Sequence, residues 1–141
     1  MTHVLSSPPV LQLRLVVETD DFDAAVDFYR DALGLREQAA YEGAGAARVV
    51  ILDAGRATLE IVNPAQRRMI DDLEVGRDVS PKIRVAFEVT DSATTTANLV
   101  NAGATLVAEP VETPWRSLNA RLEAPAGLQI TVFQELGPAA Q

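Results

Sequence analysis

The chain has 141 residues, 48% of them hydrophobic, which is enough for one globular domain with a substantial core. It contains no cysteine, which excludes disulfides, thiolate metal sites and cysteine nucleophiles. The net charge of −8 argues against nucleic acid as a partner. No apolar run approaches the roughly 18 residues of a membrane helix, and the N-terminus shows no secretory signal. We therefore expect a cytoplasmic protein without a membrane partner.

An internal repeat divides the chain into two similar halves. The segment LRLVVETDD, residues 13–21, returns as IRVAFEVTD, residues 83–91, so that Arg84 follows Arg14 by 70 residues. A helical pattern follows each copy and ends near Gly34 or Gly103, and short β-like segments follow each helix. Each copy is expected to be one supersecondary unit that buries its apolar face only when joined to its partner.

The first half predicts a strand, a helix and three more strands. Apolar residues alternate with mainly polar ones over 11–17, which is typical of a half-buried strand with one apolar face. Acidic residues then suit a helix N-terminus, and an apolar stripe predicts an amphipathic helix that ends at Gly34. The stripe consists of Phe22, Ala25, Val26, Tyr29 and Leu33. Strands are expected over 36–41, 47–52 and 58–62. We interpret 11–62 as a βαβββ module.

The second half repeats this order after a connecting segment, 63–80. Asn63 and Pro64 are typical of a helix cap and first helical position, and Met69, Ile70 and Leu73 form an apolar stripe in a helix predicted over 63–75. This helix could be a lid over the site, a dimer arm, or packed against its own domain.

The second module is assigned to residues 81–135. It predicts a strand over 82–89, a Thr-rich helix over 92–102, and strands over 105–108, 116–123 and 129–134. Pro110 and Pro114 flank a stretch that is expected to be irregular. The whole chain, 1–141, is thus interpreted as a single domain of two modules.

Two runs carry a family resemblance. DFDAAVDFYRDALGL, residues 21–35, and NARLEAPAGLQ, residues 119–129, resemble the glyoxalase/bleomycin-resistance/dioxygenase proteins, the vicinal-oxygen-chelate superfamily. The resemblance covers 11–135 and implies an α+β fold in which two βαβββ modules form a curled mixed-sheet cup. It also implies a ligand inside the cup and commonly a homodimer. This superfamily contains metal enzymes as well as metal-free drug-binding proteins, so the fold alone does not decide the function.

The resemblance also indicates where a metal would bind. In metal-dependent relatives the ligands come from the first and last strand of each module, and those positions hold Arg14, Glu60, Arg84 and Thr131. Guanidinium offers no lone pair, so Glu60 is the only matching metal ligand. The single histidine, His3, precedes both modules. We expect no cofactor; the alternative is a hard divalent cation, such as Mg²⁺ or Mn²⁺, held by carboxylate and amide oxygens.

Strand alternation predicts a set of polar side chains that face into the cup. They are Gln12, Arg14, Glu18, Thr58, Glu60, Lys82, Arg84, Glu88, Gln129 and Thr131. The arginines and Glu60 could hold an anionic or hydrogen-bond-rich ligand through planar contacts. Alternatively, Glu60 could form only an ion pair with Arg14 or Arg84 that neutralises a buried charge.

Three further residues are candidates for ligand binding. Trp115 could stack on a planar ligand, or it could cover the core or a dimer seam. Asn119 and Arg121 share one strand face, which the resemblance turns toward the cup. The only histidine lies in the N-terminal tail, so the sequence gives little support to a Ser-His-Asp hydrolase.

Together these patterns favour a metal-free protein that binds a small organic molecule in a dimeric cup. The predicted ligand-binding residues are Arg14, Glu60, Arg84, Thr131, Trp115, Asn119 and Arg121. The alternative is a lyase, isomerase or dioxygenase-type enzyme of the same superfamily that uses Glu60 as a base or residual metal ligand. A third possibility is a domain that only assembles with another protein.

Overall fold

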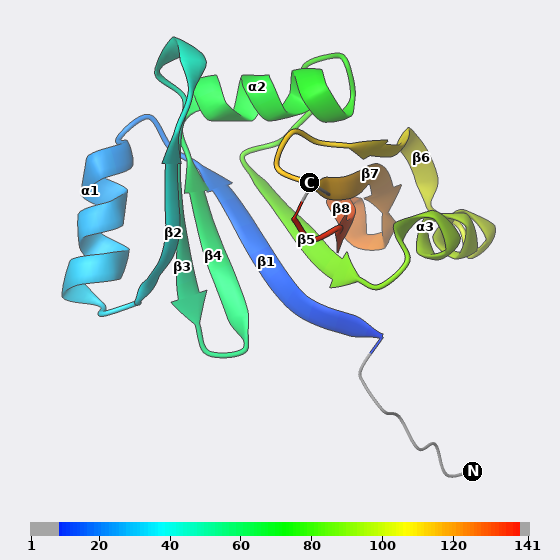
Figure 1. Ribbon diagram of the computed structural model, residues 1–141, viewed down its shortest axis with the longest axis horizontal. Coiled ribbons are helices and arrows are strands. Elements are labelled where there is room, and N and C mark those ends of the chain that lie inside the picture. The colour runs from blue at the N-terminus through cyan, green and yellow to red at the C-terminus, as the bar shows by residue number, and fades with distance from the viewer. Residues whose placement is uncertain (1–8, 139–141) are drawn as a thin grey trace, which may run out of the picture.

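The structure is a computed structural model that describes residues 9–138. Eight strands form one mixed sheet in the order β2-β3-β4-β1-β5-β8-β7-β6 (Figure 1). The strands are β1 (Val10–Glu18), β2 (Glu37–Glu42), β3 (Arg48–Ala54), β4 (Ala57–Val62), β5 (Ile83–Val89), β6 (Thr105–Glu112), β7 (Ser117–Ala124) and β8 (Leu128–Glu135). The helices are α1 (Phe22–Val26), the π-helix η1 (Asp27–Ala32), α2 (Pro64–Glu74), α3 (Ser92–Asn101) and the short 3₁₀ turns η2 (Ala44–Ala46) and η3 (Pro125–Gly127). The predicted order βαβββ occurs twice.

The two halves meet at an approximate two-fold axis between β1 and β5. These strands are antiparallel, with Leu15 opposite Val85, Arg14 opposite Ala86, and Val16 opposite Arg84. A shift of 70 residues turns each of the last two pairs into the other. Strand β4 runs parallel to β1 as β8 runs parallel to β5. Repeat-related residues therefore occupy equivalent positions on the sheet.

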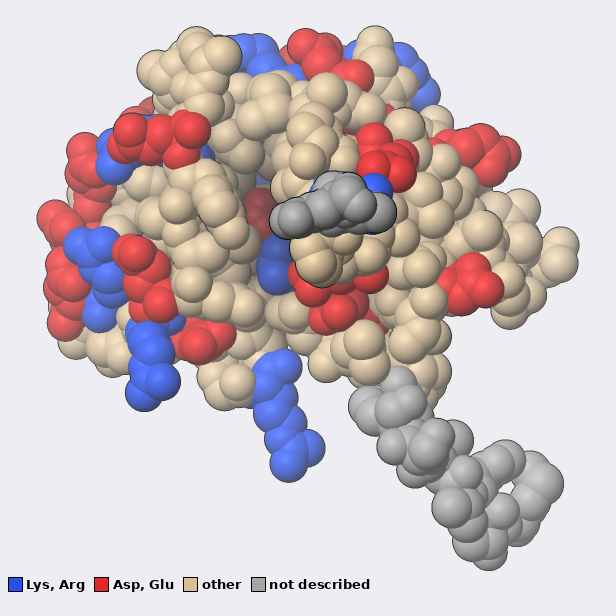
Figure 2. All heavy atoms as spheres, in the orientation of Figure 1, with Lys and Arg blue, Asp and Glu red and all other residues tan. Residues whose placement is uncertain are grey.

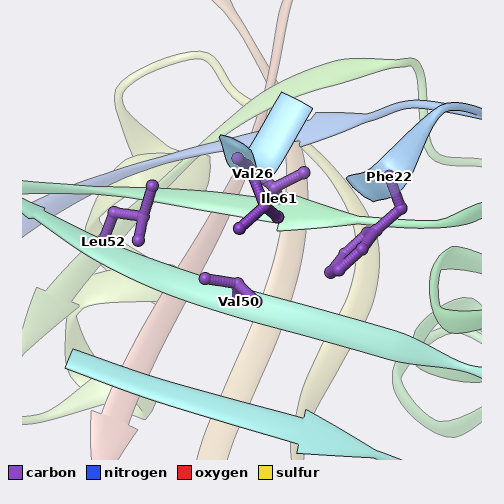
Figure 3. Packing of buried hydrophobic residues seen from close by; sticks show 5 residues of the cluster. All are labelled: Phe22, Val26, Val50, Leu52 and Ile61. Carbon is purple, nitrogen blue, oxygen red and sulfur yellow. The ribbon is translucent and has the colours of Figure 1, made fainter. Parts of the chain in front are cut away.

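The helices α1 and α3 cover the convex face of the sheet. Phe22 and Val26 of α1 pack on Val50, Leu52 and Ile61 of β3 and β4 (Figure 3). A second core cluster joins the sheet to α3 and consists of Val89, Ala120, Leu122, Ile130 and Val132, with Leu99 of α3 packed against it. These two cores hold the strands whose opposite faces line the concave side.

The first predicted helix is wrong beyond Val26, because the chain continues as the π-helix η1. The Leu33 amide donates to the Phe28 carbonyl five residues earlier, at 2.9 Å. The wider turn rotates later side chains away from the predicted stripe, so that Leu33 is 62% exposed and Tyr29 is also exposed. The rings of Phe28 and Tyr29 contact each other edge to face instead.

The apolar face of β1 is less buried than its alternation predicts. Leu11 and Leu13 are exposed, as is Ile83 of β5. Figure 1 shows the reason: α1 lies against the β2–β4 side and α3 against the β6–β8 side, so the convex face of β1 and β5 lies between the two helices.

The stretch around Pro110 was expected to be irregular, but it belongs to β6. The pairing between β6 and β7 shifts register between Ala108 and Val111, which accommodates the proline. Strand β6 is also an edge strand, which is where sheets tolerate a proline without its N–H.

Helix α2 connects the two halves and crosses the top of the molecule in the view of Figure 1, from the β2–β4 half toward the β6–β7 half. Its predicted cap is confirmed: the Asn63 side chain accepts from the Gln66 amide at 2.9 Å, and Pro64 occupies the first turn. Its buried residues, however, are mostly polar: Gln66, Ile70, Asp71 and Glu74. Leu73 of the predicted apolar stripe is exposed. Among the helices of residues 9–138, none has the length and apolarity to cross a membrane.

Candidate ligand-binding site

A cavity of about 660 Å³ lies on the concave side of the sheet, in the size range of small-molecule sites. The strands supply its floor and α2 supplies one wall through Gln66, Met69, Ile70 and Glu74. Figure 2 shows a hollow between the two halves of the molecule, with acidic and basic atoms at its bottom. Of the predicted ligand-binding residues, six line this cavity: Arg14, Glu60, Arg84, Thr131, Trp115 and Asn119.

The sheet register places the central residues of the floor. Glu60 on β4 and Arg84 on β5 both pair with Val16 of β1, so an apolar side chain separates the Glu60 carboxylate from the Arg84 guanidinium. Thr131 on β8 pairs with Ala86 of β5, as Glu60 pairs with Val16 of β1. Thr131 is therefore the pseudo-symmetric equivalent of Glu60, and Arg84 that of Arg14.

In the first module, Arg14 is engaged on several sides. Its Nη1 donates to Glu60 Oε1 at 3.4 Å, and its Nε donates to Thr58 Oγ1 at 3.1 Å. Its guanidinium also lies over the Phe133 ring, 5.2 Å from the centroid. One of the two ion pairs considered from the sequence, Arg14–Glu60, is thus present.

In the second module, Arg84 has a neutral partner. Its Nη1 donates to Thr131 Oγ1 at 2.7 Å, and within residues 9–138 no carboxylate oxygen lies within 4.0 Å of its guanidinium. Arg84 is only 6% exposed. Burial, followed by the nearby positive charge of Arg121, lowers the pKa of Arg84. The structure therefore holds a buried guanidinium whose charge lacks direct compensation.

Arg121 lies outside the cavity lining, although it was predicted as a ligand-binding residue. It is fully buried beneath α2, where it donates to Asp71 Oδ1 at 3.1 Å and to Glu74 Oε1 at 2.7 Å. It also donates to Ser80 and to Gln129. These contacts assign Arg121 to the attachment of α2, which in turn places the α2 wall of the cavity.

Asn119 links this buried network to the cavity. Its Nδ2 donates to Glu74 Oε2 at 2.8 Å, and its Oδ1 accepts from the Ser117 hydroxyl. Near the two edges of the sheet, the exposed aromatic side chains of Trp115 and Tyr41 also line the cavity. Asn119 is thus a polar group within the cavity, and the two aromatic residues offer faces on which a planar group could stack.

Several other residues expected to face the cup lie outside the cavity lining. Glu18 pairs with Arg67 at 3.0 Å, Gln12 donates to Glu88 at 2.8 Å, and Lys82 is exposed. Gln129 is held between Arg121 and Glu123. None of these side chains is in the cavity lining.

Sequence reasoning missed Gln66 and Glu74, which α2 contributes to the cavity. With Ile70 they recur every four residues, a spacing that places all three on one helix face. This spacing was a usable signal for the inward face of α2, whereas the apolar stripe predicted from the sequence includes Leu73, which is exposed.

The residues at the four positions that hold the ligands in metal-dependent relatives do not fit a metal ion. Arg14 and Arg84 cannot coordinate a cation, Thr131 offers one neutral oxygen, and Glu60 is paired with Arg14. Among residues 9–138, no three His, Cys, Asp or Glu side chains are grouped so that they could hold an ion. His3 lies outside the described residues.

The paired βαβββ modules and the cavity on the concave face define a cup-shaped, two-module class of protein. Residues 14–133 match the family model described as the glyoxalase-like domain, and the chain belongs to this family. The resemblance to the glyoxalase/bleomycin-resistance/dioxygenase superfamily and the α+β fold are thereby confirmed. No curated protein matches the sequence.

Solved structures with the same fold span almost the whole chain. A hypothetical protein from Bacillus halodurans C-125 is 15% identical, with a TM-score of 0.67 and coverage of 91% of this chain and 96% of that chain. Methylmalonyl-CoA epimerase from Mycobacterium tuberculosis is 21% identical, with a TM-score of 0.64 and coverage of 96% and 95%. A 4-hydroxymandelate synthase mutant from Streptomyces coelicolor is 22% identical, with a TM-score of 0.61 and coverage of 94% and 40%. At these identities the similarity establishes the fold alone.

Proposed function

We propose that the chain is a metal-free member of its family that binds a small organic molecule in the cup. One observation carries the proposal. The four positions that hold the ligands in metal-dependent relatives are occupied here by Arg14, Glu60, Arg84 and Thr131, around a cavity of about 660 Å³. Apolar side chains supply most of its walls, and the arginines and Glu60 supply the polar groups that would orient a ligand.

The test is a thermal-shift screen with anionic, neutral and cationic small organic compounds. A ligand at about 100 times its Kd stabilises the folded state by about 2.7 kcal/mol, which raises Tm measurably. Ala39 lines the cavity and packs against Val49 and Ile51, so Ala39→Trp should fill the cavity and abolish the shift. Ala40→Trp, at the exposed neighbouring position of β2, is the matched control. A shift that survives Ala39→Trp, or the absence of any binder, contradicts the proposal.

A second candidate function is enzymatic. Glu60 is a buried carboxylate that lines the cavity beside Arg14, an arrangement that could remove a proton next to a ligand carbonyl while an arginine stabilises the resulting charge. Incubation of bound carbonyl compounds in D₂O would show Glu60-dependent exchange at that carbon if this function holds. Binding without exchange would leave the binding function alone.

We also propose a homodimer formed through the convex face of β1 and β5. Leu11, Leu13 and Ile83 are exposed there, and large apolar side chains grouped on a surface favour association. The patch lies across the approximate two-fold axis between Leu15 and Val85, so its two halves are similar. A surface of this kind suits an isologous contact with a second copy of the chain.

A further inference from the structure

The two modules offer equivalent arginines, and only one of them has a carboxylate partner. Arg14 is paired with Glu60, whereas at the position equivalent to Glu60 the second module has Thr131, whose hydroxyl accepts one hydrogen bond from Arg84. Resting on the function proposed above, we propose that Arg84 binds a carboxylate group of the ligand. In the second module, this carboxylate would be the counterpart of the Glu60 carboxylate beside Arg14 in the first.

The free donors of Arg84 suit this role. Thr131 engages Nη1, and Nε and Nη2 have no hydrogen-bond partner within residues 9–138. These two nitrogens form one edge of the guanidinium, the edge that binds a carboxylate through two parallel hydrogen bonds. Arg84 is more than nine-tenths buried and lines the cavity, so a ligand there would meet a largely desolvated cation.

The cavity lining has two buried carboxylates, Glu60 and Glu74, and both are committed elsewhere, whereas its other two, Glu42 and Glu135, are exposed. Glu60 is two strand spacings from Arg84, about 10 Å between backbones, with Val16 between them. Glu74 accepts from Arg121 through one oxygen and from Asn119 through the other. Neither acid can therefore replace a ligand carboxylate on Arg84 without breaking its present contacts.

The remaining lining narrows the ligand to a monocarboxylate with an apolar body. The walls carry Val16, Val49, Ile51, Met69, Ile70 and Phe133. The lining also has four carboxylates, of Glu42, Glu60, Glu74 and Glu135, against three arginines, Arg14, Arg84 and Arg116, and this excess of negative charge disfavours a second anionic group or a phosphate dianion. One carboxylate on Arg84 and an apolar or aromatic remainder over Val16 satisfy both features.

The experiment measures three acids against their neutral amides by calorimetry, up to about 10 mM. The pairs are benzoate and benzamide, phenylacetate and phenylacetamide, and indole-3-acetate and indole-3-acetamide. At least one acid should bind about 10- to 100-fold more tightly than its amide, the range expected for charge-assisted hydrogen bonds. Inorganic phosphate should bind more weakly than that acid.

Variants identify the anchor. Arg84→Gln should remove the preference for the acid, and Thr131→Glu should remove it by supplying an internal carboxylate. Arg56→Gln, in the exposed turn between β3 and β4, should leave it unchanged. Should Arg84→Gln fail to fold, the NMR signal of the Arg84 Nε–H in the unmodified protein is the deciding readout, and it should shift with the acid and not with the amide.

The outcomes separate this inference from the proposed function. If acids and amides bind equally, if the preference survives Arg84→Gln, or if phosphate binds more tightly than every acid, the carboxylate anchor is overturned while the ligand-binding cup stands. If no acid binds and the Arg84 signal does not move, the anchor is also overturned, and the thermal-shift screen with Ala39→Trp then decides the proposed function by itself.

Discussion

Glu60 and Thr131 occupy equivalent positions in the two modules, and they give the equivalent arginines different partners. Glu60 lies 3.4 Å from Arg14, whereas Thr131 lies 2.7 Å from Arg84 and carries no charge. The two-fold symmetry of the backbone is thus broken in the chemistry of the cavity floor.

Glu60→Gln should strengthen the binding of monocarboxylates. The change removes the carboxylate that engages Arg14 and leaves a second arginine in the cavity without a charged partner. We expect affinity for the best acid of the panel to rise about tenfold, which corresponds to about 1.4 kcal/mol. Calorimetry measures this, with Glu109→Gln at an exposed position of β6 as the control. Unchanged or weaker binding would contradict the role given to Glu60.

Arg121→Ala should destabilise the protein strongly, because it leaves Asp71 and Glu74 buried without their partner. Breaking a buried ion pair from one side costs about 3–5 kcal/mol. Arg30→Ala removes an arginine of a solvent-screened surface network and should cost far less stability than Arg121→Ala. Urea unfolding of the two variants measures the difference. Similar losses in both would show that the Arg121 network does not hold α2.

Asp71 should make stability fall in acid. Burial opposes its ionisation, but hydrogen bonds from the Ser80 hydroxyl, the Ser80 and Val79 amides and Arg121 outweigh burial, so the pKa of Asp71 is lowered. A carboxyl with a lowered folded-state pKa stabilises the protein fully above its unfolded-state value of about 3.9 and loses this contribution as the pH falls through the folded-state value.

The measurement is urea unfolding between about pH 6 and pH 2 for the unmodified protein and for Asp71→Asn. The variant should be less stable at neutral pH, and the gap between the two proteins should shrink below about pH 4. A gap that stays constant with pH would mean that the ionised form of Asp71 contributes nothing.

Leu13→Lys combined with Ile83→Lys should produce a monomer. Both positions are exposed on the convex face of β1 and β5, so the folded chain tolerates the charges while a symmetric contact would bring like charges together. Light scattering should give twice the mass of one chain for the unmodified protein and the single mass for the variant. Leu33→Lys, at the exposed residue that follows η1, should remain dimeric. A monomeric unmodified protein would contradict the proposed dimer.

The repeat made the fold predictable to a large extent. A shift of 70 residues relates Arg14 to Arg84 in the sequence, and the same shift relates them across the axis between β1 and β5. The departures have local physical causes. The π-helix η1 changes which side chains face inward, so Tyr29 and Leu33 are exposed despite their helical spacing.

The site was predictable only in part, because strand alternation gives the face of a residue and not its partner. Arg14, Glu60, Arg84, Thr131 and Asn119 were correctly placed on the concave side. The same alternation could not show that Arg121 would pair with acids of α2, since these acids lie 47 to 50 residues away in the chain. The roles of the five cavity residues in ligand binding stay predictions.

The central claim is that the cup binds an organic ligand directly and not through a metal. Calorimetry on chelator-stripped protein, titrated anaerobically with Ni²⁺, Zn²⁺, Mn²⁺ and Fe²⁺, tests it most directly. We predict no stoichiometric binding tighter than about 10 μM, or roughly −7 kcal/mol, for any of the four ions. Stoichiometric binding with a Kd tighter than this, lost in Glu60→Ala, would contradict the account and make Glu60 a metal ligand.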